Sequence, residues 1–311
     1  MAILVAASIG TGCGGGAGDR SHGQLVACGE STTVQYSHHD GVPAGLNSLD
    51  VYMPPADDDG DCSERPLVVW IHGGGWTAGD KTDDIEHKVR LFNDAGFVLA
   101  SINYRLTDPE SDPPAPQHPV HDQDSADAVA WLIDNAKRLG VDPGRVAVLG
   151  HSAGGGIAAA ITTDGTYLGR HGLDVDSIRC AGSVDGEGYD VVAGATHPDP
   201  NRSETYLNVF GTDPAVWPGA SPINHVTPAA GIPDYFVAAR GVDVRLDQHA
   251  EFVAALHEAG IPVTVVDARA LDHAEVSVNI GAPDDTVVTP VLMEFLQGCF
   301  VEPRTKAAPG P

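Results

Sequence analysis

From residue 66 onward, short apolar runs alternate with longer segments of helical periodicity. Residues 67–71 are a continuous apolar run, as expected of a strand buried on both faces of a sheet, and residues 97–103 form another largely apolar strand. Residues 122–139 carry apolar side chains at helical spacing, and Gly140 marks the end of that helix. Further strands are expected at 145–149, 178–184, 235–239 and 263–266, and further helices at 83–95, 153–161, 246–259 and 285–296. This alternation predicts an α/β fold with a mostly parallel central sheet flanked by helices.

Two segments interrupt the alternation. Residues 107–119 contain five prolines and are expected to form a loop. Residues 186–231 are rich in Gly, Pro, Asn and Asp and leave room only for short helices. We expect the second segment to form a short cap or loop insertion over the carboxyl ends of the strands, where such folds bind ligands.

The strongest chemical signal lies between the expected strand 145–149 and the expected helix 153–161, and reads Gly150-His151-Ser152-Ala153-Gly154-Gly155. A G-x-S-x-G sequence in that context is a nucleophile elbow, in which a strained turn exposes the serine hydroxyl. The helix amino terminus then directs N–H groups at a developing anion. A Gly-rich helix start with a capping serine is the structural alternative.

The second signal directly follows the strand 67–71 and reads His72-Gly73-Gly74-Gly75-Trp76. Glycines there let main-chain N–H groups approach a tetrahedral oxyanion. We expect Gly73 and Gly74 to donate, with Ala153 as the third donor. The alternative, a phosphate-binding loop, lacks the lysine and helix that a P-loop needs. His72 is interpreted as a structural residue that orients this loop.

Together these motifs resemble those of α/β-hydrolase esterases and lipases of the hormone-sensitive-lipase-like or carboxylesterase-like group. More narrowly, the chain resembles the bacterial family of small secreted esterases and lipases with an HGGGW loop and a GHSAGG elbow. The resemblance extends from about Val42 to Leu296 and includes Asn103-Tyr104-Arg105, Asp142-Pro143 and Ala220-Ser221-Pro222. It implies a single α/β-hydrolase domain over residues 25–300, preceded by a leader at 1–24 and followed by a tail at 301–311.

The resemblance also indicates the remaining members of a triad, whose order in this fold is Ser, acid, His. Asp243 follows the strand 235–239 at the family's acid position, although the spacing to the next helix is about two residues short. Asp247 is the alternative, and Asp267 and Asp272 are weaker candidates. His273, which lies after the last strand and before the last helix, matches the family's catalytic histidine.

The expected reaction is attack of Ser152 on an ester carbonyl, with His273 as general base. It requires no metal or organic cofactor. We expect Trp76, Tyr189 and Trp217 to line the substrate site, and a short- to medium-chain acyl ester as substrate. An arylformamidase and a carbohydrate acetyl or feruloyl esterase are alternatives on the same frame. A non-catalytic α/β-hydrolase scaffold protein is a remote alternative from a different class.

Composition limits the partners. The 311 residues include 17 basic and 43 acidic side chains, which gives a formal net charge of −26. This excess argues against nucleic acid as a partner, since nucleic-acid binding needs a basic surface. It also argues against docking on anionic lipid through a polybasic face. The expected partner is a small-molecule ester.

The amino terminus and the cysteines suggest a protein that is secreted or anchored in a bacterial cell envelope. Residues 1–9 are apolar except Ser8 and are followed by small residues around Cys13, a pattern that predicts a signal segment with a candidate lipid anchor at Cys13. The four other cysteines allow three pairings outside the cytosol. We expect Cys28–Cys62 and Cys180–Cys299; four buried free thiols are the alternative in a cytosolic protein.

The negative charge predicts that added salt maintains or raises both stability and activity, because counterions screen the self-repulsion of the acidic surface. Thermal unfolding in NaCl up to about 1 M, where the screening length is ~3 Å, checks this expectation. A melting temperature that falls steadily as NaCl is added would contradict it.

Overall fold

The computed structural model describes residues 25–241 and 243–301; the side chains of residues 243 and 244 are not described. The expected leader at 1–24, with its candidate lipid-anchor residue Cys13, lies outside the described residues. So does the expected tail, except for Val301, which ends the last helix.

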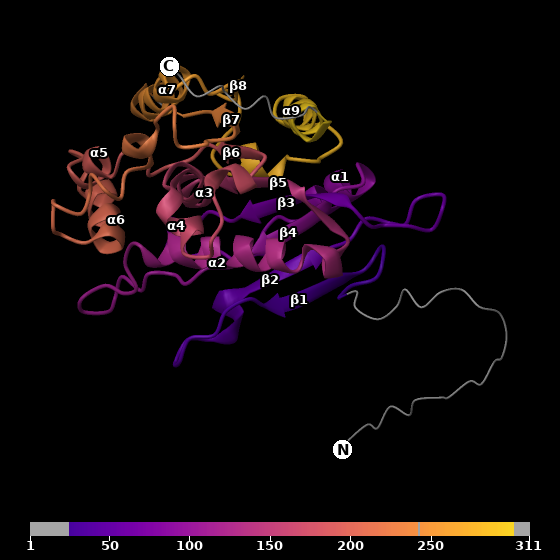
Figure 1. Ribbon diagram of the computed structural model, residues 1–311. Helices are drawn as coiled ribbons and strands as arrows, with labels where there is room; N and C mark the ends of the chain where they lie inside the picture. The colour runs from indigo at the N-terminus through magenta and orange to yellow at the C-terminus, as the bar shows by residue number, and fades with distance from the viewer. Residues whose placement is uncertain (1–24, 242, 302–311) are drawn as a thin grey trace.

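An eight-stranded sheet crosses the molecule in the order β1-β2-β4-β3-β5-β6-β7-β8 (Figure 1). The first two strands pair antiparallel with each other, and β2 pairs antiparallel with β4. Every pair from β4 to β8 is parallel. The strands are β1 (Ser31–Gln35), β2 (Ser48–Tyr52), β3 (Arg65–Ile71), β4 (Val98–Ile102), β5 (Val141–His151), β6 (Cys180–Val184), β7 (Asp234–Ala239) and β8 (Val263–Asp267).

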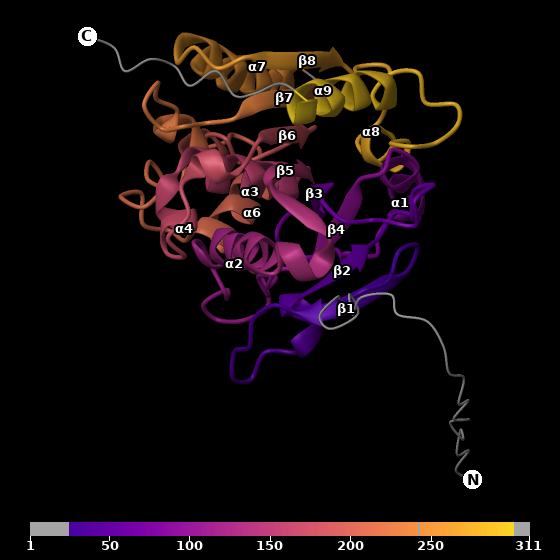
Figure 2. The same ribbon diagram turned by 45° about the vertical axis from the view of Figure 1, so that its right-hand side comes forward.

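Helices cover both faces of the sheet (Figure 2). The helices α2, α3 and α7 pack on one face, and α1 and α9 pack on the other. The α-helices are α1 (Glu86–Asp94), α2 (Val120–Asp134), α3 (Ala153–Thr163), α4 (Gly165–Gly169), α5 (Val191–Ala195), α6 (Pro200–Phe210), α7 (Asp243–Glu258), α8 (Glu275–Val278) and α9 (Thr289–Val301). Short 3₁₀ helices occupy Ala44–Asn47, Ala136–Leu139, Val175–Ser177 and Pro222–His225.

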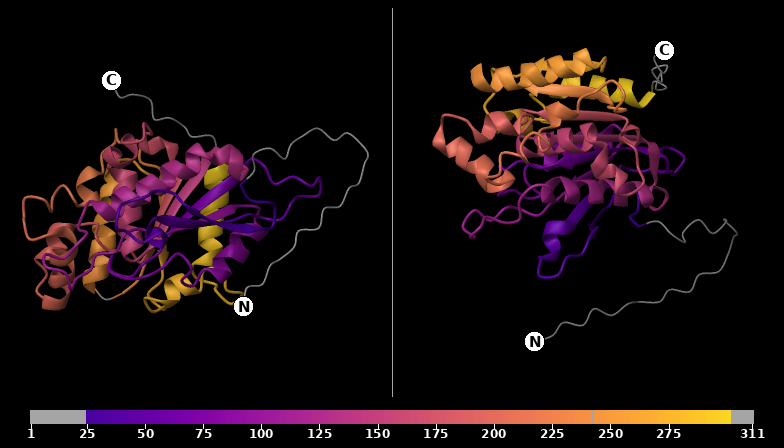
Figure 3. Two further views of the ribbon diagram at one scale, coloured as in Figure 1. Left: turned by 90° about the horizontal axis from the view of Figure 1, so that it is seen from below. Right: turned by 60° about the vertical axis from the view of Figure 1, so that its left-hand side comes forward.

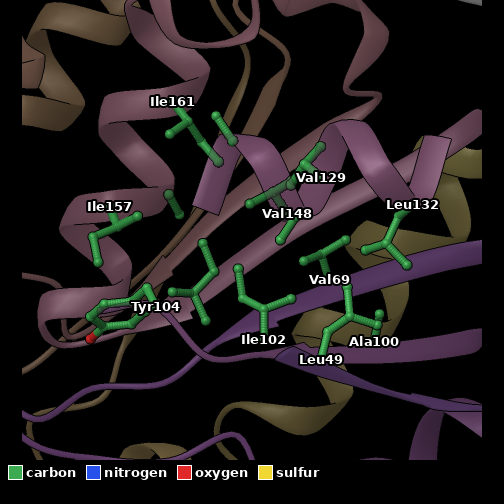
Figure 4. Packing of buried hydrophobic residues seen from close by; sticks show 14 of the residues in the cluster. Leu49, Val69, Ala100, Ile102, Tyr104, Val129, Leu132, Val148, Ile157 and Ile161 are labelled. Atoms are coloured by element: carbon green, nitrogen blue, oxygen red, sulfur yellow. The ribbon is translucent and has the colours of Figure 1, made fainter. Parts of the chain in front are cut away.

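Alternate residues of the central strands point into two apolar cores, one on each face of the sheet. Val69 and Val148 point toward α2 and α3, where Ile157 and Ile161 meet them, and all four side chains are fully buried (Figure 4). Their neighbour Trp70 points to the opposite core, beneath α1 and α9. Burial of each such aliphatic side chain stabilises the fold by about 1.5–3 kcal/mol. This double burial explains why the central strands read as continuous apolar runs.

The predicted α/β architecture is confirmed, but β1 and β2 were not predicted. The residues of β1, Ser-Thr-Thr-Val-Gln, alternate between exposed and half-buried positions at the edge of the sheet, so they carry little apolar signal. The helix expected at 122–139 is divided at Asn135 into α2 and the 3₁₀ helix Ala136–Leu139.

The segment 186–231 forms a cap that contains α5 and α6. Figure 3 shows these two helices together at one end of the sheet. They approach closely, since a Cβ on Gly194 would lie 2.1 Å from the Tyr206 ring. The proline-rich loop joins the cap through the His118 N–H, which donates to the Val209 carbonyl at 2.7 Å. The cap therefore lies beside the loop that follows β4.

Both expected disulfides are present. Cys28–Cys62 ties the segment before β1 to the segment before β3, and Cys180–Cys299 ties the start of β6 to α9. The sequence separations are 34 and 119 residues, so each bond removes considerable freedom from the unfolded chain. No helix within the described residues is long and apolar enough to span a bilayer.

Replacing both Cys28 and Cys62 with alanine should lower the free energy of unfolding by about 2–4 kcal/mol, since the closed loop has 34 residues. Denaturant unfolding of the purified double variant measures this loss, with the wild type under reducing conditions as a comparison. An unchanged unfolding midpoint, with the wild-type bond verified by mass, would contradict a stabilising role.

Candidate active site

Ser152 lies on a strained turn between β5 and α3. Its φ of 54° and ψ of −122° are unfavourable for a residue with a side chain and cost about 1–3 kcal/mol. Neighbouring glycines make the turn sterically feasible. A Cβ on Gly150 would lie 2.1 Å from the Gly154 carbonyl oxygen, and a Cβ on Gly154 would lie 2.3 Å from that of Ile71. The turn is the predicted elbow, with Ser152 at the amino terminus of the eleven-residue helix α3.

The glycine loop after β3 lies directly against this turn. A Cβ on Gly73 would lie 3.1 Å from the Ser152 Cβ. Gly74 has a φ of 111°, and a Cβ there would lie 2.1 Å from the Ala78 carbonyl oxygen, so only glycine fits. The main chain of the loop can therefore come close to a molecule bound at Ser152, as can that of Ala153 at the start of α3.

His72 packs against the glycine loop and holds it through the contacts of its imidazole ring. Its Nδ1–H donates to the Gly73 carbonyl oxygen at 2.7 Å, and its ring stacks on Tyr104 at 4.5 Å. The Tyr104 hydroxyl donates to the His72 carbonyl oxygen at 3.1 Å. Burial lowers the pKa of His72, so the imidazole is held neutral. These contacts fit the structural role that the sequence suggested.

His273 follows β8 and faces Ser152. Its Nε2 lies 2.9 Å from the Ser152 Oγ, in position to accept the hydroxyl proton. The preceding residue fixes the loop, because Asp272 Oδ1 accepts the N–H groups of Ala274 and Glu275 at 2.8 and 2.7 Å. The His273 side chain is 40% exposed, so one side of this pair opens to solvent.

The carboxylate on His273 comes from Asp185, at the end of β6. The His273 Nδ1–H donates to Asp185 Oδ2. The Asp185 side chain is fully buried, its φ is 44°, and its N–H donates to the Ala238 carbonyl oxygen of β7 at 2.9 Å. Ser152, His273 and Asp185 thus form one hydrogen-bonded line from three different strand ends.

Groups from α7 and from the end of β7 surround this buried carboxylate. His249 Nε2 donates to Asp185 Oδ1 at 3.2 Å. Arg240 and Arg245 place guanidinium nitrogens 3.3 and 3.2 Å from Asp185 Oδ2, and Arg245 also pairs with Glu187. Burial alone would raise the pKa of the Asp185 carboxyl. The hydrogen bonds from His249 and His273 and the charge of Arg245 outweigh burial and hold that pKa far below its ordinary value.

Asp185 was not among the carboxylates considered from the sequence. The predicted acid Asp243 is the first residue of α7, and its side chain lies outside the described part of the chain. Asp247 is exposed on α7, and Asp267 pairs with Arg269 at the surface. Asp272 caps α8.

Asp185 follows β6, whereas Asp243 follows the neighbouring strand β7. Because β6 and β7 are parallel neighbours, their carboxyl ends open at the same edge of the sheet, and either can present a carboxylate to His273. The available sequence signal was the Asp185-Gly186 pair directly after the expected strand 178–184.

Two of the expected substrate residues are buried. Trp76 and Tyr189 are 2% and 1% exposed, so their side chains offer almost no surface to a ligand. Trp76 packs against Phe210 of the cap, and a Cβ on Gly188 would lie 2.9 Å from its ring. Trp217 is half-buried and donates its Nε1–H to the Gly211 carbonyl oxygen at 3.0 Å. The contacts of Trp76 and Trp217 are therefore part of the packing of the cap.

Outside this site, one cluster within the described residues has ligand atoms at metal-binding spacing, formed by His39, Asp124 and Asp127. Both carboxylates already have partners. Arg105 holds Asp124 through two hydrogen bonds of 2.8 and 2.6 Å, and His171 Nε2 donates to Asp127 at 2.8 Å. The cluster is therefore best described as an ion-pair network.

A cavity of about 500 Å³ lies between α7 and β8. Leu246, Val253 and Val265 are among its lining residues, and neither Ser152 nor His273 belongs to its wall. His249, which donates to Asp185, also lines it, so the cavity adjoins the far side of the Asp185 contacts without including Ser152 or His273.

Curated proteins similar to this chain include esterases. Esterase LipI of Mycobacterium tuberculosis is 29% identical over 262 residues, which cover 79% of this chain and 76% of that protein. Carboxylesterase NlhH of the same species is 37% identical over 136 residues, which cover 42% of this chain and 37% of that protein.

Solved structures agree with this assignment at the level of the fold. The structure described as a truncated form of carbohydrate esterase from gut microbiota has a TM-score of 0.70 at 19% identity, over 90% of this chain and all of that one. The profile of the BD-FAE family matches residues 49–231, which is more than half of the chain. The chain therefore belongs to the BD-FAE family, and it is an α/β-hydrolase that acts as a carboxylic ester hydrolase.

Proposed function

We propose that this protein hydrolyses short- to medium-chain acyl esters with Ser152 as nucleophile, His273 as general base and Asp185 as the acid of the triad. The 2.9 Å contact between Ser152 Oγ and His273 Nε2, with Asp185 on Nδ1, is the observation that carries the proposal. The esterase relatives support ester cleavage as the reaction.

In the first step, His273 Nε2 takes the hydroxyl proton while Ser152 Oγ bonds to the ester carbonyl carbon. The carbonyl π electrons move onto oxygen and form an oxyanion. Main-chain N–H groups of Gly73, Gly74 and Ala153 would stabilise it, and one such donor contributes about 10²–10³ in rate. The imidazolium then protonates the alcohol oxygen as the bond between that oxygen and the acyl carbon breaks.

The second step releases the carboxylic acid product. Water enters where the alcohol left, gives a proton to His273 and attacks the acyl carbon. The second oxyanion then collapses, the bond from the acyl carbon to Ser152 Oγ breaks, and His273 returns the proton to that oxygen. Asp185 keeps the imidazole in the tautomer whose Nε2 can accept a proton, and stabilises the imidazolium that forms in each step. Its depressed pKa means that the carboxyl stays ionised while this happens.

The exposure of His273 bears on the alcohol part of the substrate. The leaving alcohol takes its proton from His273, so the alcohol must lie beside that side chain. Because the side chain is 40% exposed, the alcohol can extend into solvent. This favours tolerance of large alcohols, including sugars, and makes a carbohydrate-bound acyl ester the second candidate.

We also propose that the protein works outside the cytoplasm. Both disulfides support this location, because such bonds persist in oxidising compartments. Lipid attachment at Cys13 stays a prediction from the sequence.

Ser152→Ala should abolish ester hydrolysis. Loss of the nucleophile costs at least ~10⁴-fold in kcat in hydrolases of this kind, because the triad acts as a unit. Hydrolysis of p-nitrophenyl esters from acetate to palmitate measures the loss and the preferred acyl length. A fluorophosphonate probe should label the wild type and not the variant. Full activity in the variant, or equal labelling of both proteins, would contradict the assignment.

Asp185→Asn should reduce kcat by about 10³–10⁴-fold, because an amide cannot hold the productive imidazole tautomer. Asp243→Asn serves as the matched control and should keep kcat within about tenfold of wild type. Melting temperatures of both variants separate loss of catalysis from loss of folding. The opposite order, with Asp243→Asn crippled and Asp185→Asn active, would return the acid role to Asp243.

A further inference from the structure

His151, the residue before the nucleophile, contacts the segment that carries the base. Its Nε2–H donates to the main-chain carbonyl oxygen of His273 at 2.8 Å. The two imidazole rings lie 4.7 Å apart at an interplanar angle of 37°. The bond joins residues that are 122 positions apart in the sequence, so it fastens the loop after β8 to the elbow after β5.

The opposite side of the same ring lies against the glycine loop. A Cβ on Gly73 would lie only 2.9 Å from His151 Nδ1. One side chain therefore contacts both the backbone that holds the base and the backbone proposed to hold the oxyanion. His151 directly precedes Ser152 in the chain. A change in the His151 side chain would therefore alter its contacts with both the His273 segment and the glycine loop.

The surroundings of His151 keep it uncharged. Burial is the main cause that lowers its pKa to about 4, and the charge of His273 adds to it. The hydrogen bond to the His273 carbonyl oxygen and the charge of Asp185 act in the opposite direction but do not outweigh burial. The buried Lys88, whose Nζ donates to the Ser277 carbonyl oxygen at 2.8 Å, acts in the same direction as burial. A neutral ring with its proton on Nε2 can donate to a carbonyl oxygen.

We propose that His151 is a positioning residue for the base, in which a neutral imidazole donates to the His273 carbonyl and holds the His273 ring between Ser152 and Asp185. This inference rests on the proposed function. It gives a role to the variable position of the G-x-S-x-G motif that the mechanism above leaves unused.

Distance and charge together explain why an imidazole suits this position. The His273 ring must stay within hydrogen-bond reach of two groups on opposite sides, and a displacement of about 1 Å can cost 10²-fold in rate. The ring also gains a positive charge in each step. Arg245 Nη1 already lies 3.3 Å from His273 Nδ1, and a neutral donor at 4.7 Å can hold the loop without adding to that positive charge.

Amide side chains of two lengths test the hydrogen bond. The glutamine Nε2 lies about as far from the backbone as the histidine Nε2, and the asparagine amide is one bond shorter. We expect His151→Gln to keep kcat within about threefold of wild type, and His151→Asn to lose about 10- to 100-fold. The KM for p-nitrophenyl acetate should stay within about twofold in both, because the substrate does not contact this group.

The apolar variant His151→Leu should match His151→Asn in kcat. The acid limb of its kcat/KM profile against pH should not move, since a neutral group is removed. His171→Leu is the control, because His171 makes a hydrogen bond of the same 2.8 Å length to Asp127, which is not a member of the proposed triad. It should keep the wild-type kcat. Melting temperatures of all variants report folding.

Equal kcat in the glutamine and asparagine variants, whether high or low, would overturn the proposal, because the donor's reach would then not matter. So would a shift of the acid limb in the folded leucine variant, which would indicate a charged or proton-carrying role. A wild type that hydrolyses no ester and binds no fluorophosphonate would overturn the proposed function itself. Ester hydrolysis by the wild type with unaltered His151→Asn kinetics would overturn this inference alone.

Discussion

The site depends on one imidazole reaching two partners at once. His273 must place Nε2 against the Ser152 hydroxyl and Nδ1 against the Asp185 carboxylate, and these groups stand at the ends of neighbouring strands β5 and β6. A parallel sheet makes this geometry available, because its strands all end at the same edge. The strained turn at Ser152, the glycines around it and the loop after β8 bring the three side chains together there.

Burial of the Asp185 carboxylate would be unfavourable without compensation. Here His249 of α7 and the guanidinium groups of Arg240 and Arg245 offset the cost of burying the charge. Arg245 also forms an ion pair with Glu187. The ionised carboxylate therefore stays available to His273 while the ring itself remains open to solvent on one side. This division, with a buried carboxylate and a partly exposed imidazole, fits the proposed roles, in which the imidazole exchanges protons with an alcohol and with water.

The sequence predicted the parts of the site that are carried by local motifs. Ser152 and the loop at Gly73 follow apolar strands directly, and short-range glycine spacing marks both. His273 could be located because it lies between the last strand and the last helix. The acid could not be located with the same security, because each strand end in so acidic a chain offers an aspartate. Choosing Asp185 over Asp243 requires knowing which strand end faces the imidazole.

The same limit applies to Trp76 and Tyr189. Their position near the motifs suggested ligand contact, but burial is a property of the packed cap, and both proved almost fully covered. The disulfide pairing, by contrast, agreed with the structure: Cys28–Cys62 joins two segments early in the chain, and Cys180–Cys299 joins two segments of its second half.

A crystal structure of the protein after reaction with a small alkyl fluorophosphonate tests the account most directly. We predict a phosphonyl group on Ser152 Oγ, with its oxygen ~2.7–3.1 Å from the N–H groups of Gly73, Gly74 and Ala153, and with His273 Nδ1 on Asp185. A covalent bond at another residue, or an imidazole turned away from Asp185 toward Asp243, would contradict it.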